Sequence, residues 1–178
     1  MTYIKRYSSP LGGILIAANG GRITGLWFDG AKYYAAGLPA EYIAADVPVL
    51  SEAVRWLDIY FSGKEPDFLP PLDITGSAFR REVCGMLLQI PYGTTVTYGD
   101  VAKELAIGRG ASGMSAQAVG GAVGHNRISL MIPCHRVVGA DGSLTGYAGG
   151  IGRKAWLLRL EQGGCSHDIN RWIMHGNL

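Results

Sequence analysis

The protein has 178 residues, of which 48% are hydrophobic and 17% charged, enough to bury a core as one globular domain or two small ones. This composition excludes disordered, collagen-like and coiled-coil proteins, and no apolar run approaches the roughly 20 residues that a membrane-spanning helix needs. The net charge of +2 is uneven, because residues 1–75 carry six Lys and Arg against eight Asp and Glu, whereas residues 76–178 carry ten against six. The second part is therefore the better candidate for binding nucleic acid, with a solvated basic face as the alternative explanation.

The first thirty residues alternate short apolar runs with turn signals, which predicts a small antiparallel meander. Its strands are expected at 14–18 and 23–28, joined by Asn19-Gly20-Gly21, the strongest hairpin signal in the chain. From Pro48 to Phe61 the apolar period becomes helical, and Ser51 is positioned to cap that helix.

A stretch rich in proline and glycine, residues 66–76, predicts a linker to a largely helical second part. Ser77 is expected to cap a helix that ends near Gln89. Two shorter helices are expected at 98–105 and 115–123, separated by a flexible loop at 108–113. This pair has the form of a helix-turn-helix, although ordinary packing of two helices on a core explains the same pattern.

Three cysteines are present, Cys84, Cys134 and Cys165. An odd and sparse count does not form a disulfide framework and fits a reducing compartment, so we expect a soluble, cytoplasmic protein. Residues 1–83 contain neither Cys nor His, which excludes a zinc site there, and the group Cys165, His167 and His175 is too sparse to predict a metal site.

The most informative stretch is Ile132-Pro133-Cys134-His135-Arg136-Val137-Val138, where a thiol, an imidazole and a guanidinium are consecutive in an apolar segment. Buried polar groups need partners, and nearby positive charge lowers the pKa of a thiol and so populates the nucleophilic thiolate. A packed core cysteine beside a histidine that bonds to the backbone is the competing interpretation. Neighbouring side chains of an extended segment point to opposite faces, so coupling Cys134 to His135 needs a water or a third residue.

Further blocks surround this stretch in a defined order between about Phe79 and Glu161. They are Thr95-Val96-Thr97-Tyr98, Ala118-Val119-Gly120-Gly121-Ala122, Asn126, Gly142-Ser143-Leu144-Thr145-Gly146-Tyr147 and Lys154-Ala155-Trp156-Leu157-Leu158. Together with the Pro-Cys-His-Arg-Val core, these blocks resemble the 6-O-alkylguanine-DNA alkyltransferases, also called methylated-DNA-protein-cysteine methyltransferases. The N-terminal part is similar to the more variable ribonuclease-H-like domain of that family.

The resemblance implies that the Cys134 thiolate attacks the alkyl carbon on guanine O6 and that guanine leaves as its anion, so each molecule acts once. It makes His135 the base, coupled to Cys134 through a water and oriented by Glu161. It also places Asn126 in the turn beneath the site and makes Tyr98 the proton donor to guanine. These roles fit the chemistry, because a thiol needs a proton acceptor and a leaving anion needs a donor. From the residues alone, Glu161 is a solvated carboxylate, Tyr98 a half-buried aromatic and Asn126 an ordinary turn residue.

The resemblance further implies that guanine is recognised by main-chain groups of Cys134, Val137 and Ala148, with Tyr147 on the pocket loop. The alkylated base must leave the duplex to be reached, and the second helix of the pair enters the minor groove. The predicted DNA-contacting residues are Thr95, Ala118, Gly121, Arg127 and Arg136.

Gln117 departs from the family pattern, since many members have an arginine there that fills the gap left by the extruded base. Glutamine offers hydrogen bonds to the orphaned cytosine but no charge near phosphates. Arg109 or Arg127 is an alternative residue for this role.

The sequence therefore predicts an α+β protein: a ribonuclease-H-like antiparallel sheet with a helix at 1–75, a helix-turn-helix catalytic domain at 76–165, and a tail at 166–178. The expected function is single-turnover repair of alkylated guanine in double-stranded DNA by a monomer that needs no cofactor and no metal. Three rival hypotheses are a lesion-binding protein without transfer, a cysteine hydrolase that turns over, and a helix-turn-helix regulator.

Overall fold

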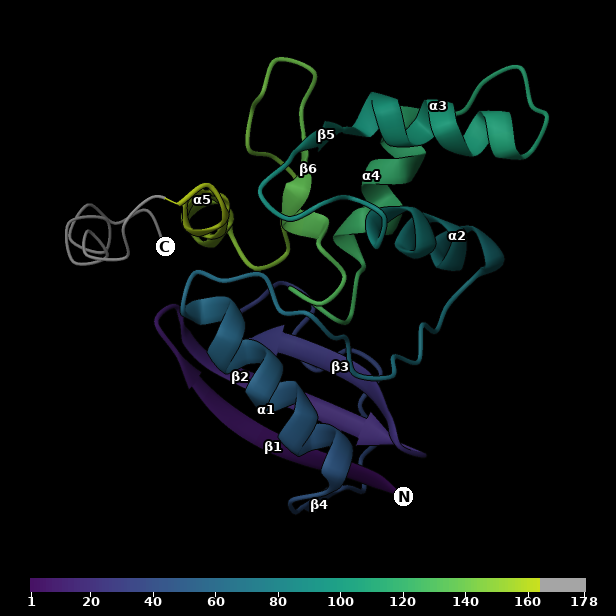
Figure 1. Ribbon diagram of the computed structural model, residues 1–178. Helices are drawn as coiled ribbons and strands as arrows, with labels where there is room; N and C mark the ends of the chain where they lie inside the picture. The colour runs from purple at the N-terminus through teal and green to yellow at the C-terminus, as the bar shows by residue number, and fades with distance from the viewer. Residues whose placement is uncertain (164–178) are drawn as a thin grey trace.

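The N-terminal part is a four-stranded sheet covered by one helix, as the computed structural model, which describes residues 1–163, shows (Figure 1). The strands are β1 (Thr2–Ser9), β2 (Gly12–Asn19), β3 (Arg22–Phe28) and β4 (Ile43–Ala44), in the order β3-β2-β1-β4. The first three are antiparallel, which confirms the predicted meander. The parallel pairing of β4 with β1 was not predicted, because two residues carry no recognisable period.

The hairpin between β2 and β3 has the geometry that its sequence demands. Gly20 and Gly21 have φ values of 55° and 74°, the left-handed values that a two-residue turn of this kind requires at both central positions. Glycine takes these values without a steric penalty, so the turn fixes the pairing of the two strands.

Helix α1 (Pro48–Phe61) begins and ends where the sequence predicts and lies across one face of the sheet (Figure 1). Its buried side chains, including Leu50 and Leu57, pack on the sheet. The predicted cap was wrong, because Val47 is the N-cap and Ser51 lies inside the first turn. Pro48 at the first helical position has no N–H to satisfy and a backbone angle already suited to a helix, so the start needs no side-chain cap.

The second part is mainly helical, as predicted. Its elements are α2 (Ala78–Leu87), β5 (Val96–Thr97), α3 (Tyr98–Gly108), α4 (Ala116–Gly124), a 3-10 turn η1 (Cys134–Arg136), β6 (Val137–Val138) and α5 (Ile151–Glu161). Ser77 caps α2 as expected, although α2 ends two residues before Gln89. Helix α3 continues three residues beyond Leu105 and leaves a shorter loop before α4.

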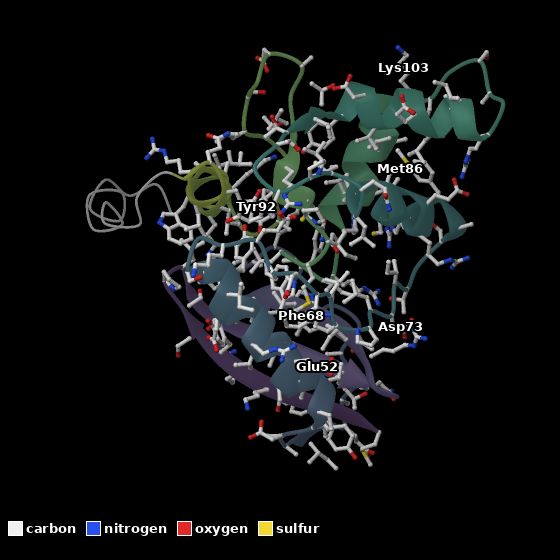
Figure 2. All side chains as sticks on the ribbon, in the orientation of Figure 1. Glu52, Phe68, Asp73, Met86, Tyr92 and Lys103 are labelled. Atoms are coloured by element: carbon white, nitrogen blue, oxygen red, sulfur yellow. The ribbon has the colours of Figure 1, made fainter. Side chains whose placement is uncertain are left out.

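The two parts share one hydrophobic core, and side chains from both line a cavity of about 560 Å³ where they meet. Figure 2 shows Phe68 and Tyr92 in this junction, between α1 and the helices of the second part. No helix within residues 1–163 combines the length and apolarity required to cross a membrane. The tail at 166–178, with His167 and His175, lies outside the described residues, as does Cys165.

Candidate active site

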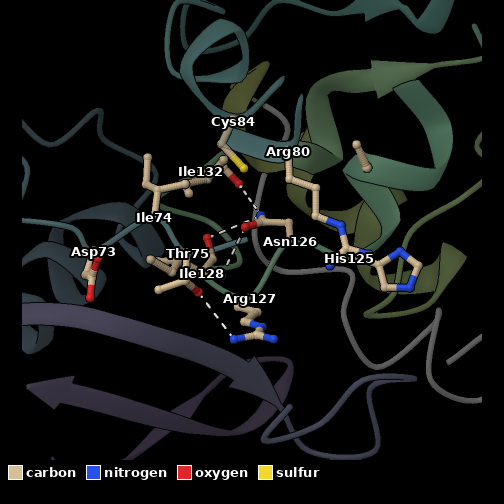
Figure 3. Close-up of a pocket in the computed structure, with 11 residues that line it drawn as sticks. Asp73, Ile74, Thr75, Arg80, Cys84, His125, Asn126, Arg127, Ile128 and Ile132 are labelled. Carbon is tan, nitrogen blue, oxygen red and sulfur yellow. Dashed lines mark hydrogen bonds between the residues drawn. The ribbon is translucent and has the colours of Figure 1, made fainter. Parts of the chain in front are cut away.

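The thiol of Cys134 lies inside the protein, 5% exposed, on the 3-10 turn η1. Asn126 holds this turn in place: its side-chain amide donates to the carbonyl of Ile132 at 2.9 Å, while its oxygen accepts from the Ile128 N–H (Figure 3). The same amide also donates to the Cys134 sulfur at 3.1 Å. The predicted extended conformation around Cys134 was wrong, because Pro133 and the Asn126 contacts favour a tight turn. Asn126 therefore supports the turn and also touches the sulfur.

Opposing effects act on the Cys134 thiol. Burial raises its pKa above the ordinary value, whereas the Asn126 hydrogen bond, the nearby charge of Lys154 and backbone N–H groups lower it. Burial prevails, so the resting sulfur holds its proton. The nucleophilic form of a cysteine is the thiolate, so any reaction at this sulfur requires that the proton be removed.

His135 is fully buried and is bonded through one ring nitrogen only. Nε2 lies 2.6 Å from the Glu161 carboxylate, while Nδ1 has no hydrogen-bond partner among residues 1–163. A carboxylate accepts a proton in this bond, so Nε2 carries the hydrogen of the neutral ring and Nδ1 is left as an acceptor. Burial lowers the pKa of His135 more than Glu161 raises it, so the imidazole is neutral and its Nδ1 is free to accept a proton.

Glu161 is buried and accepts most of the hydrogen bonds in this network, so it is not a solvated carboxylate at a helix end. It also accepts hydrogen bonds from Arg136 Nε at 2.8 Å, Arg136 Nη2 at 3.1 Å and the Gly93 N–H at 3.1 Å. Burial alone would raise the pKa of Glu161, but the hydrogen bonds and charges of His135 and Arg136 lower it to about 2. The carboxylate is therefore ionised and fixed in orientation.

Arg136 was predicted to contact DNA, but the structure places its guanidinium in the interior. Besides its two bonds to Glu161, Nη1 donates to the carbonyl of Ile90 at 2.7 Å. A guanidinium whose donors face a buried carboxylate is not available to a phosphate. Arg136 balances the charge of Glu161 instead.

Tyr60 of α1 is a member of this network that sequence reasoning missed. Its hydroxyl donates to Glu161 at 2.7 Å and lies 3.2 Å from His135 Nε2, and the side chain is fully buried. Its position three residues after Leu57, on the buried face of the helix, was the available signal, since a buried tyrosine hydroxyl generally has a partner. The N-terminal part thus reaches the buried carboxylate of Glu161.

A second buried cation, Lys154 of α5, joins the turn to the pocket loop at 139–150. Its ammonium group donates to the carbonyls of Val137 at 2.5 Å and Thr145 at 2.7 Å. Burial lowers the pKa of Lys154 to about 8. The sequence block that contains Lys154 was noticed, but the lysine was not predicted as a site residue.

The other predicted pocket residues gather around the same loop. Tyr98 donates its hydroxyl to the Thr145 carbonyl at 2.8 Å, and Gly146, with φ 75°, lies so close to Tyr98 that a Cβ there would be 2.6 Å from the hydroxyl. The ring of Tyr147 is buried and meets the His135 ring edge-on at 6.5 Å. The carbonyl of Ala148 accepts a hydrogen bond from the backbone of Lys32.

The predicted DNA-contacting residues of α4 share one exposed face. Gln117, Ala118 and Gly121 are exposed, whereas Val119 and Val123 pack into the core. Thr95, before β5, is also exposed. The arrangement leaves small side chains on the outer face of α4, which allows another molecule to approach its backbone.

The two arginines considered as substitutes for Gln117 are engaged elsewhere. Arg127 donates to Thr75 at 3.3 Å and lies against Gly37, so it joins the two parts of the protein (Figure 3). Arg109 forms an ion pair with Glu82 of α2 at 2.8 Å. Neither lies on the exposed face of α4, where Gln117 is located.

The fold and the site define a protein that presents a helix pair to a partner and holds a buried thiol behind it, backed by an imidazole and a carboxylate. The sequence matches the family described as "6-O-methylguanine DNA methyltransferase, DNA binding domain" over residues 78–163 and "6-O-methylguanine DNA methyltransferase, ribonuclease-like domain" over residues 2–74. The chain belongs to the 6-O-methylguanine DNA methyltransferase family.

Individual relatives extend over almost the whole chain. A methylated-DNA–protein-cysteine methyltransferase of Mycobacterium bovis is 40% identical and covers 95% of this chain and 98% of its own length. One from Haemophilus influenzae is 37% identical, with coverages of 90% and 86%. The solved structure of Mycobacterium tuberculosis OGT in complex with DNA is 39% identical, covers 94% of this chain and 97% of its own, and superposes with a TM-score of 0.80.

Proposed function

We propose that this protein repairs DNA by moving the methyl group from O6 of guanine to its own Cys134 in a single, irreversible turnover. The observation that carries this proposal is a buried thiol on a turn next to a neutral histidine whose other nitrogen is held by an ionised carboxylate. The family's printed descriptions and the DNA complex of the tuberculosis relative support duplex DNA as the partner.

The proposed reaction has a simple balance of bonds and protons. The Cys134 proton passes through a bridging water to His135 Nδ1, the sulfur forms a bond to the methyl carbon, and the bond between that carbon and O6 breaks with its electron pair going to guanine. Tyr98 gives a proton to the guanine anion, since burial raises the pKa of Tyr98 and keeps it protonated until then. The thioether formed has no proton to lose and is a poor leaving group, so the protein acts once.

The surrounding residues hold this chemistry in place. Glu161 fixes the tautomer of His135 and stabilises the imidazolium that forms, while Arg136 and Tyr60 orient Glu161. Asn126 and Lys154 stabilise the developing thiolate. The proposed reaction transfers one methyl group and two protons and involves no oxidation or reduction, so these side chains suffice without a cofactor.

The guanine-binding and DNA-binding roles complete the proposal. Val137 forms the guanine pocket together with Tyr147 and Ala148 of the pocket loop. Gln117, Ala118, Gly121 and Thr95 present the exposed face to the minor groove. We also propose that the protein works as a monomer in the cytoplasm, with its domains divided at the linker near residue 75.

The experiment mixes equimolar protein with a duplex that carries one O6-methylguanine and measures the intact mass and the modified peptide. We expect the mass to rise by one methyl group, located on the peptide of Cys134, with no second turnover. Cys134→Ser should bind the same duplex and gain no mass, because a hydroxyl is a far weaker nucleophile at neutral pH. Cys84→Ser is the matched control, since burial raises the pKa of Cys84 to about 11 and its removal should leave transfer unchanged.

Each rival function gives a different outcome in this assay. A protein that only binds the lesion, or a regulator, keeps its original mass. A cysteine hydrolase returns to its original mass while product continues to accumulate.

A further inference from the structure

A groove of about 410 Å³ lies beside the exposed face of α4 and is lined by three segments of the chain. One side is α4 itself, at Gly120, Gly121 and Gly124. A second side is the end of the pocket loop, from Gly146 to Gly150, with Ile151 at the start of α5. The third side comes from the N-terminal part, at Lys32 and Tyr33. Since Gly121 belongs both to this groove and to the proposed DNA-contacting face, the groove opens where the duplex would lie.

The N-terminal side of the groove is held firmly against the pocket loop. The Lys32 backbone donates to the Ala148 carbonyl at 3.0 Å. The guanidinium of Arg153, in α5, donates hydrogen bonds to three carbonyls, those of Leu11, Asp29 and Gly149, at 3.1, 2.9 and 3.0 Å. These bonds fix the segment after Asp29 relative to the loop that forms the pocket, so Lys32 is placed before any ligand binds.

The side chain of Tyr33 is stacked on the second helix of the pair. Its ring lies 4.4 Å from the ring of His125, with an interplanar angle of 25°, and His125 Nδ1 is 2.7 Å from the Gly121 carbonyl. Aromatic rings stacked in this way form a stiff wall with an apolar face. The wall stands at the end of α4, next to the backbone that the duplex would approach.

Lys32, which follows β3, differs from Lys5 and Arg6 of β1 in its surroundings. Lys5 and Arg6 form ion pairs with Asp46 and Asp29, whereas the exposed Lys32 ammonium lies 5.3 Å from the Tyr33 ring. Within residues 1–163 no carboxylate lines the groove. An exposed ammonium group beside backbone and aromatic surface matches a DNA phosphate better than it matches a second protein surface.

We propose that Lys32 and Tyr33 extend the DNA interface into the N-terminal part. Lys32 contacts a backbone phosphate beside the extruded nucleotide, and the stacked rings of Tyr33 and His125 form one side of the groove. This proposal rests on the proposed function. The N-terminal part carries more Asp and Glu than Lys and Arg, so its composition does not by itself predict a DNA contact there.

The test measures binding to a methylated duplex across a salt series, in a Cys134→Ser background so that no transfer occurs. Removing one phosphate contact should reduce the slope of log affinity against log salt by about 0.9 in Lys32→Gln, an effect of about 3-fold between 50 and 200 mM salt. Lys64→Gln, at an exposed lysine just beyond α1, removes the same charge and should keep the original slope. Tyr33→Ala should weaken binding by about 2- to 10-fold, whereas Tyr33→Phe keeps the stacked ring and the affinity.

A separate measurement keeps the proposal distinct from the proposed function. With Cys134 intact, Lys32→Gln should take the methyl group from free O6-methylguanine base at the rate of the unsubstituted protein, because the free base has no phosphate. An unchanged salt slope in Lys32→Gln, or an equal change in Lys64→Gln, overturns the proposal. A wild-type protein whose mass does not change with methylated duplex overturns the proposed function instead.

Discussion

The hydroxyl of Tyr60 offers the sharpest test of how the buried network supports catalysis. Tyr60→Phe removes a single oxygen, the donor that lies 2.7 Å from Glu161, and leaves the ring stacked on Trp56. A hydrogen bond to a charged group contributes about 1.5–3 kcal/mol, and here the acceptor is buried. We expect the free energy of unfolding to fall by about that amount and the rate of methyl transfer to fall by up to about 10-fold as Glu161 and His135 lose a fixed orientation.

The pH dependence separates a positioning role from simple support of the fold. With one donor fewer, the Glu161 carboxylate interacts more strongly with a protonated His135, so the pKa of His135 rises. Transfer requires the neutral imidazole, and the acid limb of the rate profile therefore moves to higher pH in Tyr60→Phe. The assay is single-turnover methyl transfer from pH 5 to 8, with unfolding by urea followed in parallel.

A matched control exists on the same domain. Tyr7 donates to the Asp58 carboxylate at 2.9 Å on the exposed surface, so Tyr7→Phe removes the same kind of bond outside the site. It should change the free energy of unfolding by less than about 1 kcal/mol and leave the transfer rate and its pH profile unchanged. A Tyr60→Phe protein that is less stable yet transfers methyl groups with the original rate and pH profile would refute the positioning role.

Two further changes test the exposed face and the buried lysine. Gln117→Arg should tighten binding to a methylated duplex and steepen its salt dependence if this position fills the gap in the base stack; unchanged binding and repair rates would assign the gap to another residue. Lys154→Met removes a group whose pKa is about 8 in the folded protein and 10.5, the ordinary value for lysine, in the unfolded chain. Between these values the unfolded chain binds more protons, so this group makes the wild-type protein more stable as pH rises from 8 to 10.5, and the variant should lack that rise in urea unfolding. The same variant should transfer methyl groups more slowly at neutral pH, since the pocket loop loses its link to Val137; equal rates would contradict the assigned role.

The local elements and the chemistry of the site can be predicted from short stretches of the sequence. Two adjacent glycines with the required backbone freedom specified the hairpin between β2 and β3, an apolar helical period specified α1, and the blocks around Cys134 pointed to the family. Each of these signals lies within a few residues, where propensity and pattern act directly. The ends of the helices were predicted less accurately, as the C-terminal end of α3 and the N-cap of α1 show, because these ends depend on contacts with neighbouring segments.

Which side chains come into contact depends on how distant segments pack in the folded protein. Tyr60 and Glu161 are separated by about a hundred residues, yet their oxygens are 2.7 Å apart, and Arg136 turns inward because that carboxylate needs a counter-charge. Lys32 lies at the groove beside α4 because of long-range contacts as well. Arg153 donates hydrogen bonds to the carbonyls of Asp29 and Gly149 and so holds the N-terminal segment against the pocket loop. A single sequence records the identity of such residues, but burial, pairing and orientation arise from contacts between distant segments, which have no local pattern to reveal them.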